Sequence, residues 1–232
     1  MNKLGLLKKI IILALILALP GFLYYLLTAE GKNRYKPLPI FGPKLLAKTT
    51  HQVKGKAIPD TIYHQLNDFN LTDQAGKAVS FKTFDKKVFV VNFFYTHCPT
   101  LCNQVNTNVD SLAVVWAKNK MVRFVSVTVD PARDSVGVLN TYAKKFKQSP
   151  NWLFLTGDTT TIYKLARRDL LVDALQAGRD DFIYSNKLIL IDSEKRIRGY
   201  YSGVLTTDLV RLNDEIKVLI TEELRKNDKP LY

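Results

Sequence analysis

The stretch Lys87–Cys102, KVFVVNFFYTHCPTLC, decides how the rest of the chain is interpreted. Its first part, Val88–Tyr95, is apolar, β-branched and aromatic, which is typical of a buried strand. The run breaks at Thr96-His97-Cys98-Pro99, and proline suits the first position of a helix, where its missing N–H costs nothing. The stretch therefore predicts a strand, a sharp turn and a helix over about Pro99–Lys118.

Cys98 and Cys102 are the only cysteines in the chain. At positions i and i+4 they lie on one helix face, within reach of each other or of one shared ion. The helix N-terminus favours negative charge and is expected to lower the thiol pKa of Cys98. A thiolate pair selects Cu(I) or Zn, or forms a disulfide. We interpret the pair as the functional site in an exposed loop; the competing interpretation is two buried structural cysteines.

The N-terminus predicts a membrane anchor. Ile10–Ala29 carries no charge and is long enough to cross the hydrocarbon core of a bilayer. Leu27-Thr28-Ala29 is a poor cleavage site, which disfavours the alternative of a cleaved signal peptide. We expect a cytoplasmic tail at 1–9, a single transmembrane helix at 10–29 in the inner membrane, and the globular part on the extracytoplasmic side.

The formal net charge of +13 suits a protein beside anionic lipid headgroups or an acidic protein partner. The lysines are scattered and follow no nucleic-acid-binding motif, so no nucleic-acid partner is expected.

Residues 30–66 contain several prolines and little periodicity, and predict a linker or peripheral segment. The domain follows at 67–232. Its pattern predicts strands at 68–72, 78–81, 88–94, 122–129, 152–155, 186–192 and 196–201, and helices at 99–118, 136–146, 159–171 and 207–226. This order indicates an α/β fold with a mixed central sheet flanked by helices. In such sheets, functional residues are usually located at the carboxyl ends of the parallel strands, and Cys98 and Asp130 are expected at two such ends.

Three stretches carry a family resemblance: FFYTHCPTLC, TVDPARDS after the next strand, and DFIYSNKLILID. Together they resemble the Sco/SenC family over about Asp68 to the end of the chain. The resemblance implies a thioredoxin-like fold behind a membrane anchor, copper as the metal, and a role in assembling the copper centre of cytochrome c oxidase. It also implies a partner, either oxidase subunit II or another copper or dithiol protein.

The family's copper site uses the two motif cysteines and one histidine. The cysteines correspond to Cys98 and Cys102, but the histidine position falls on Tyr184, and no histidine follows His97. Two thiolates suit Cu(I), whereas Cu(II) loses its imidazole ligand, so we expect Cu(I) rather than Cu(II), or no metal. Tyr184 is either a doubtful ligand or an aromatic cover over the dithiol.

Other polar residues have weaker claims. His97 is a possible substitute ligand, although it is expected to point away from its neighbour Cys98. Asp130 is either a second-shell group of the site or a turn acceptor. We expect structural or solvent-facing roles for the remaining side chains. His51 and His64 are expected to face solvent, and Arg133 and Asp134 to cap and brace a helix. The two methionines, Met1 and Met121, are too few for a methionine copper site.

Four functions compete. The first is a copper metallochaperone. The second is a thiol–disulfide oxidoreductase in which Cys98 attacks, Cys102 resolves the mixed disulfide, and copper binding is weak because of Tyr184. A peroxidase is disfavoured because Tyr95 stands where a threonine is needed, and an inert binding module is disfavoured by the intact cysteine pair. Whether the protein is an enzyme stays open on sequence alone.

Overall fold

The computed structural model describes residues 3–26, 37–53, 55–98, 101–147, 149–178 and 182–227. The chain divides into two units, Met1–Lys36 and Pro37–Tyr232. The first contains helix α1 (Lys3–Tyr25). Within the described residues, no helix combines the length and apolar character needed to span a bilayer. The last three residues of the predicted anchor, 27–29, lie outside the described part.

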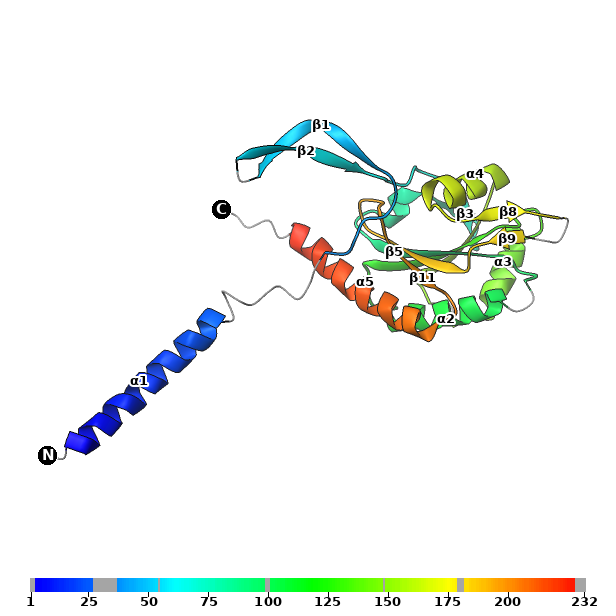
Figure 1. The fold of residues 1–232 in the computed structure, drawn as a ribbon. Coiled ribbons are helices and arrows are strands. Elements are labelled where there is room, and N and C mark those ends of the chain that lie inside the picture. The colour runs from blue at the N-terminus through cyan, green and yellow to red at the C-terminus, as the bar shows by residue number, and fades with distance from the viewer. Residues whose placement is uncertain are drawn as a thin grey trace. The chain divides into compact units, whose positions relative to one another are not determined.

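A seven-stranded sheet forms the centre of the second unit, in the order β11-β10-β5-β6-β7-β3-β4 (Figure 1). Its strands are β3 (Leu71–Asp73), β4 (Ala78–Val79), β5 (Val88–Phe94), β6 (Val122–Thr128), β7 (Trp152–Thr156), β10 (Lys187–Ile191) and β11 (Ile197–Ser202). β5, β6 and β7 are parallel, and the other pairings are antiparallel. The predicted α/β class with a mixed sheet is confirmed.

Strand β5 lies inside the sheet between β10 and β6, and every one of its residues is buried. Val88, Val90 and Phe94 belong to one apolar cluster, and Phe89, Val91 and Phe93 belong to the other. A strand that is apolar on both faces needs cover on both, as is usual for parallel strands.

The helices supply that cover (Figure 1). One face carries α2 (Leu101–Val115), α3 (Val136–Ala143) and α5 (Thr206–Asn227), and the other carries α4 (Thr159–Lys164) with its π-helical continuation η3 (Leu165–Asp169). A short 3-10 turn, η2 (Phe81–Phe84), completes the second face. Asp158 caps the start of α4 by accepting the backbone N–H of Thr161 at 2.8 Å.

Two hairpins were not predicted. Within the predicted linker, β1 (Lys44–Val53) pairs with β2 (Lys56–Tyr63) to form a separate two-stranded sheet. Its residues are mostly exposed. The sequence therefore lacks the alternation of apolar and polar residues by which a half-buried strand is recognised. The second hairpin joins β8 (Ala174–Gln176) to β9 (Phe182–Tyr184). The helices predicted at 99–118 and 136–146 end earlier, at Val115 and Ala143.

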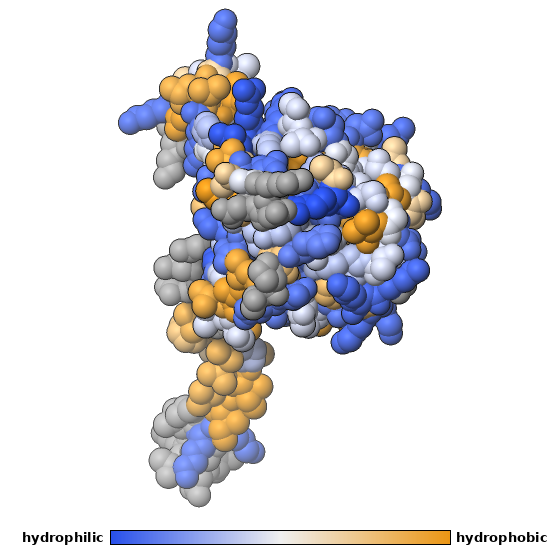
Figure 2. Space-filling view, turned by 90° about the vertical axis from the view of Figure 1, so that its right-hand side faces the viewer, coloured by the Kyte–Doolittle hydropathy of each residue, from blue (hydrophilic) through white to orange (hydrophobic). Residues whose placement is uncertain are grey.

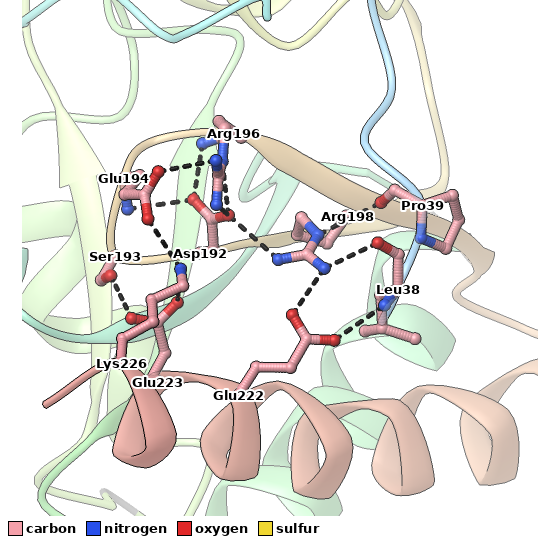
Figure 3. Close-up of polar contacts among 10 residues, drawn as sticks. All are labelled: Leu38, Pro39, Asp192, Ser193, Glu194, Arg196, Arg198, Glu222, Glu223 and Lys226. Atoms are coloured by element: carbon pink, nitrogen blue, oxygen red, sulfur yellow. Dashed lines mark hydrogen bonds and ion pairs between the residues drawn. The ribbon is translucent and has the colours of Figure 1, made fainter. Parts of the chain in front are cut away.

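The chain that enters the domain is held by a buried arginine (Figure 3). Arg198 donates to the backbone oxygens of Leu38 and Pro39 at 2.7 and 3.2 Å, and pairs with Asp192 at 3.1 Å and Glu222 at 2.7 Å. Glu222 in turn accepts the backbone N–H of Leu38 at 2.7 Å. We call these five residues the Arg198 clasp. It fixes the start of the domain against β11 and α5.

Candidate functional site

The two cysteines lie where β5 gives way to α2. Cys98 follows the strand by four residues, and Cys102 lies in the first turn of α2. They are joined as a disulfide, with their Cα atoms 5.8 Å apart. Cys98 is 7% exposed and Cys102 is 1% exposed. The expectation of an exposed loop is therefore wrong: the pair packs into the apolar cluster beneath α2 and α5.

Tyr184 closes over the disulfide. Its Oη lies 2.8 Å from Cys102 Sγ and 3.2 Å from Cys98 Sγ. Because neither sulfur of a disulfide carries a hydrogen, the phenol is the donor, and its single hydrogen is shared between the two contacts. Burial, with smaller contributions from the phenols of Tyr95 and Tyr142, raises the pKa of the Tyr184 hydroxyl to about 12. At neutral pH the residue is a neutral hydrogen-bond donor and not a phenolate ligand.

Strand β9 positions Tyr184 with help from aromatic neighbours. The ring of Tyr95, which follows β5 directly, meets Tyr184 edge-on at 5.8 Å and contacts Phe182 at 5.1 Å. The Arg133 guanidinium lies over the Phe182 ring at 5.8 Å. Stacking and cation–π contacts of this kind contribute about 0.5–1.5 kcal/mol each. They orient a strand of only three residues toward the sulfurs.

A buried carboxylate ties the cysteine turn to the neighbouring strand. Asp134 accepts the backbone N–H of Thr96 at 3.1 Å and the hydroxyls of Thr96 and Thr128. The sequence assigned Asp134 to capping and bracing a helix, but the residue at the N-cap of α3 is Ser135. The actual role connects the carboxyl ends of β5 and β6, a contact that spans 38 residues for Thr96.

Asp130 is buried and forms an ion pair with Arg133. Its backbone oxygen also accepts the N–H groups of Arg133 and Asp134 at 3.2 and 2.9 Å, as a turn acceptor does. Through Arg133, which lies over Phe182, Asp130 is connected to the strand that carries Tyr184. A second-shell role for Asp130 stays a prediction.

The histidines lie elsewhere. His97 is exposed, and its Nδ1 lies 3.1 Å from the Thr96 hydroxyl. His51 is exposed beside Asp60, whereas His64, expected to face solvent, is half-buried and contacts the Asp169 carbonyl at 2.7 Å. Across the described ranges, no three His, Cys, Asp or Glu side chains are grouped as a metal site would require. The donor set at the site is thus two sulfurs and one phenol.

This arrangement suits soft-metal or redox chemistry. In the disulfide form, Cys98 accepts the Cys102 backbone N–H at 3.2 Å, and the Tyr184 hydroxyl lies beside both sulfurs. Two thiolates fit Cu(I), which accepts low coordination and soft ligands, better than Cu(II). Among the residues of the site, Tyr184 was located only by the family resemblance. The sequence did not identify Tyr95 and Asp134 as residues that position the site.

Comparison with known proteins gives one family. The model of the SCO1/SenC family matches residues 61–219, which begin inside β2 and run into α5. The SCO1 protein homolog of Bacillus subtilis is 27% identical over 167 residues, covering 70% of this chain and 86% of that protein.

Solved structures agree with the match. The chain is similar to copper-bound ScoI of Bradyrhizobium japonicum, with 25% identity, a TM-score of 0.58, and coverage of 67% of this chain and 99% of that one. It is also similar to BsSco, a member of the Sco family of cytochrome c oxidase assembly proteins with a disulfide switch. That likeness has 26% identity, a TM-score of 0.62, and coverage of 68% and 94%.

Proposed function

The chain belongs to the SCO1/SenC family, and from this premise we propose that it assists assembly of the copper centre of cytochrome c oxidase through Cys98 and Cys102. The observation that carries the proposal is the cysteine pair at the β5–α2 turn, with one hydroxyl directed at both sulfurs. The cargo is Cu(I), which the reduced pair holds and passes by ligand exchange. The partner is oxidase subunit II or another copper or dithiol protein.

Copper titration of the full chain in detergent, fully reduced, tests the proposal. Cu(I) and Cu(II) are added separately to wild type and to Tyr184→His. We expect wild type to bind one Cu(I), and the histidine variant to gain Cu(II), because imidazole is a ligand that Cu(II) prefers and a protonated phenol is not. Cys102→Ser is the control and should lose Cu(I). A wild type that binds neither ion, beside a Tyr184→His variant that binds both, would contradict the chaperone proposal.

The alternative is a dedicated thiol–disulfide oxidoreductase acting on a partner's cysteine pair. Two observations favour it: the pair is disulfide-bonded, and the hydroxyl at the family's histidine position is protonated at neutral pH and offers a hydrogen bond. A reduction potential that permits exchange with a dithiol partner, together with weak copper binding, would support this alternative.

We also propose that residues 10–29 anchor the protein by a single pass in the inner membrane, with 1–9 in the cytoplasm and the domain on the extracytoplasmic side. The uncharged run Ile10–Ala29 supports this, as do the exposed hydrophobic side chains along α1, visible in Figure 2. Retention in membranes after alkaline carbonate treatment, and digestion of the domain by protease added to spheroplasts, are the expected results. Release by carbonate would refute the anchor.

A further inference from the structure

We infer that the Tyr184 hydroxyl makes Cys102 the leaving sulfur when the disulfide opens, and so directs an incoming thiolate to Cys98. The inference rests on the thiol-exchange part of the proposed function and deepens it. It stands on two distances, since Tyr184 Oη lies closer to Cys102 Sγ, at 2.8 Å, than to Cys98 Sγ, at 3.2 Å.

The exposure of the two cysteine residues differs in a way that agrees with these distances. Cys98 keeps some exposure and Cys102 almost none. A nucleophile therefore reaches Cys98, and the negative charge that leaves the broken bond develops on the buried Cys102. A charge buried without a hydrogen-bond partner is strongly disfavoured. Apolar residues of the same cluster, such as Val105, offer none, and among the described residues the Tyr184 hydroxyl is the donor that lies beside the Cys102 sulfur.

The donor is already in position before the bond opens. Tyr184 lies at the end of β9, paired in register with Ala174 of β8, and Tyr95 packs edge-on against its ring. The backbone N–H of the next residue, Ser185, donates to the Asp173 carbonyl at 3.0 Å. Because a hydrogen bond to a thiolate is stronger than one to a neutral sulfur, the contact tightens as charge develops. Tyr184 keeps its proton throughout.

The disulfide is reduced in two successive thiol–disulfide exchanges. A cysteine thiolate of a dithiol partner, or of a small thiol, attacks Cys98 Sγ. The Cys98–Cys102 bond breaks, its electron pair goes to Cys102 Sγ, and a mixed disulfide forms on Cys98. A second thiolate then attacks the partner's own sulfur and releases Cys98 as a thiolate. That thiolate accepts the Cys102 backbone N–H, which lies 3.2 Å away in the disulfide form. The partner leaves as a disulfide, and two electrons have entered the pair.

The experiment uses the oxidised full chain in detergent and reduced glutathione as the probe. For Tyr184→Phe we expect the disulfide to open about tenfold more slowly or worse, because the removed hydrogen bond served a charged group. The equilibrium with glutathione should shift toward the disulfide by a similar factor. Mass mapping should find the wild-type adduct on Cys98. Tyr200→Phe is the matched control, since it removes another half-buried hydroxyl, one bonded to the Leu170 carbonyl; it should open at the wild-type rate.

Circular dichroism spectra and melting curves test whether both variants, Tyr184→Phe and Tyr200→Phe, are folded. If folded Tyr184→Phe opens at the wild-type rate with an unchanged equilibrium, or if the wild-type adduct is found on Cys102, the inference is overturned. Failure of the proposed exchange chemistry looks different, because wild type itself would then form no glutathione adduct.

Discussion

The Arg198 clasp and the dithiol site both bring together residues that are distant in sequence, but they treat charge in opposite ways. In the clasp, the guanidinium of Arg198 faces two carboxylates and two backbone carbonyls (Figure 3). At the dithiol, both buried cysteines have the Tyr184 hydroxyl beside their sulfurs, and Cys98 alone also accepts the backbone N–H of Cys102. In the clasp, permanent charges of opposite sign neutralise each other. At the dithiol site, uncharged hydrogen-bond donors surround sulfurs that become negatively charged only on reduction.

The difference indicates which region can change state. Removing one partner from a buried ion pair leaves an uncompensated charge, so the clasp is stable in one arrangement only. The sulfurs can gain or lose charge because the groups around them are uncharged donors and apolar side chains. Substitutions in the clasp should therefore alter folding, and substitutions at the dithiol should alter chemistry.

The largest effect is expected for Asp192→Asn. Asp192 is fully buried and pairs with both Arg196 and Arg198. Neutralising it leaves two guanidinium groups short of a partner, which should lower the free energy of unfolding by about 3–5 kcal/mol. Urea unfolding followed by tryptophan fluorescence measures the loss.

Asp214→Asn is the matched control, because Asp214 pairs with Lys217 where both side chains are more than half exposed, at 63% and 58%. Its cost should be below about 1 kcal/mol. Glutathione should open the disulfide of Asp192→Asn at the wild-type rate under native conditions. Equal costs for the two variants would show that the clasp does not hold the domain.

A smaller effect is expected for Asp134→Asn, beside the cysteine turn. One carboxylate oxygen becomes an NH₂ group that cannot accept from Thr96 or Thr128, so a buried donor loses its partner. We expect a loss of about 1–3 kcal/mol in unfolding free energy, and faster hydrogen exchange at the Thr96 amide.

A double-mutant cycle that combines Asp134→Asn with Thr96→Val isolates the hydrogen bond between the Thr96 hydroxyl and Asp134. Valine removes the hydroxyl of Thr96 and keeps its backbone amide. The two substitutions should be non-additive, because they share one hydrogen bond. Additive effects together with unchanged amide exchange would mean that Asp134 does not hold the cysteine turn.

The sequence predicted those parts of both regions that depend on local pattern. Three local features were sufficient to place the strand, the turn and the helix: the largely apolar run of β5, the proline, and the cysteines at i and i+4. Each is decided within a few residues. Tyr184 meets Cys102 across 82 residues, and Arg198 meets Leu38 across 160. No periodicity encodes such contacts, and the family resemblance supplied only the first. The short β8 and β9 and the exposed β1–β2 hairpin lack the burial pattern by which strands are recognised.

The smallest effect is expected for Lys226→Met at the end of α5, beside the clasp (Figure 3). Burial disfavours the charged ammonium, but hydrogen bonds and ion pairs with Glu194 and Glu223 outweigh it and raise the pKa of Lys226. A pKa raised by folding stabilises the protein fully below the ordinary lysine value of about 10.4. That contribution is lost as the pH rises through the folded-state pKa.

Wild type should therefore lose stability more steeply than Lys226→Met as the pH rises above about 10, measured by urea unfolding at a series of pH values. Lys217→Met is the control, because its ion pair with Asp214 is exposed and screened by solvent. Tyrosines that titrate in the same range are common to all three proteins and cancel in the difference. Parallel curves for wild type and Lys226→Met would mean that the charges at this end of α5 do not contribute to holding the helix.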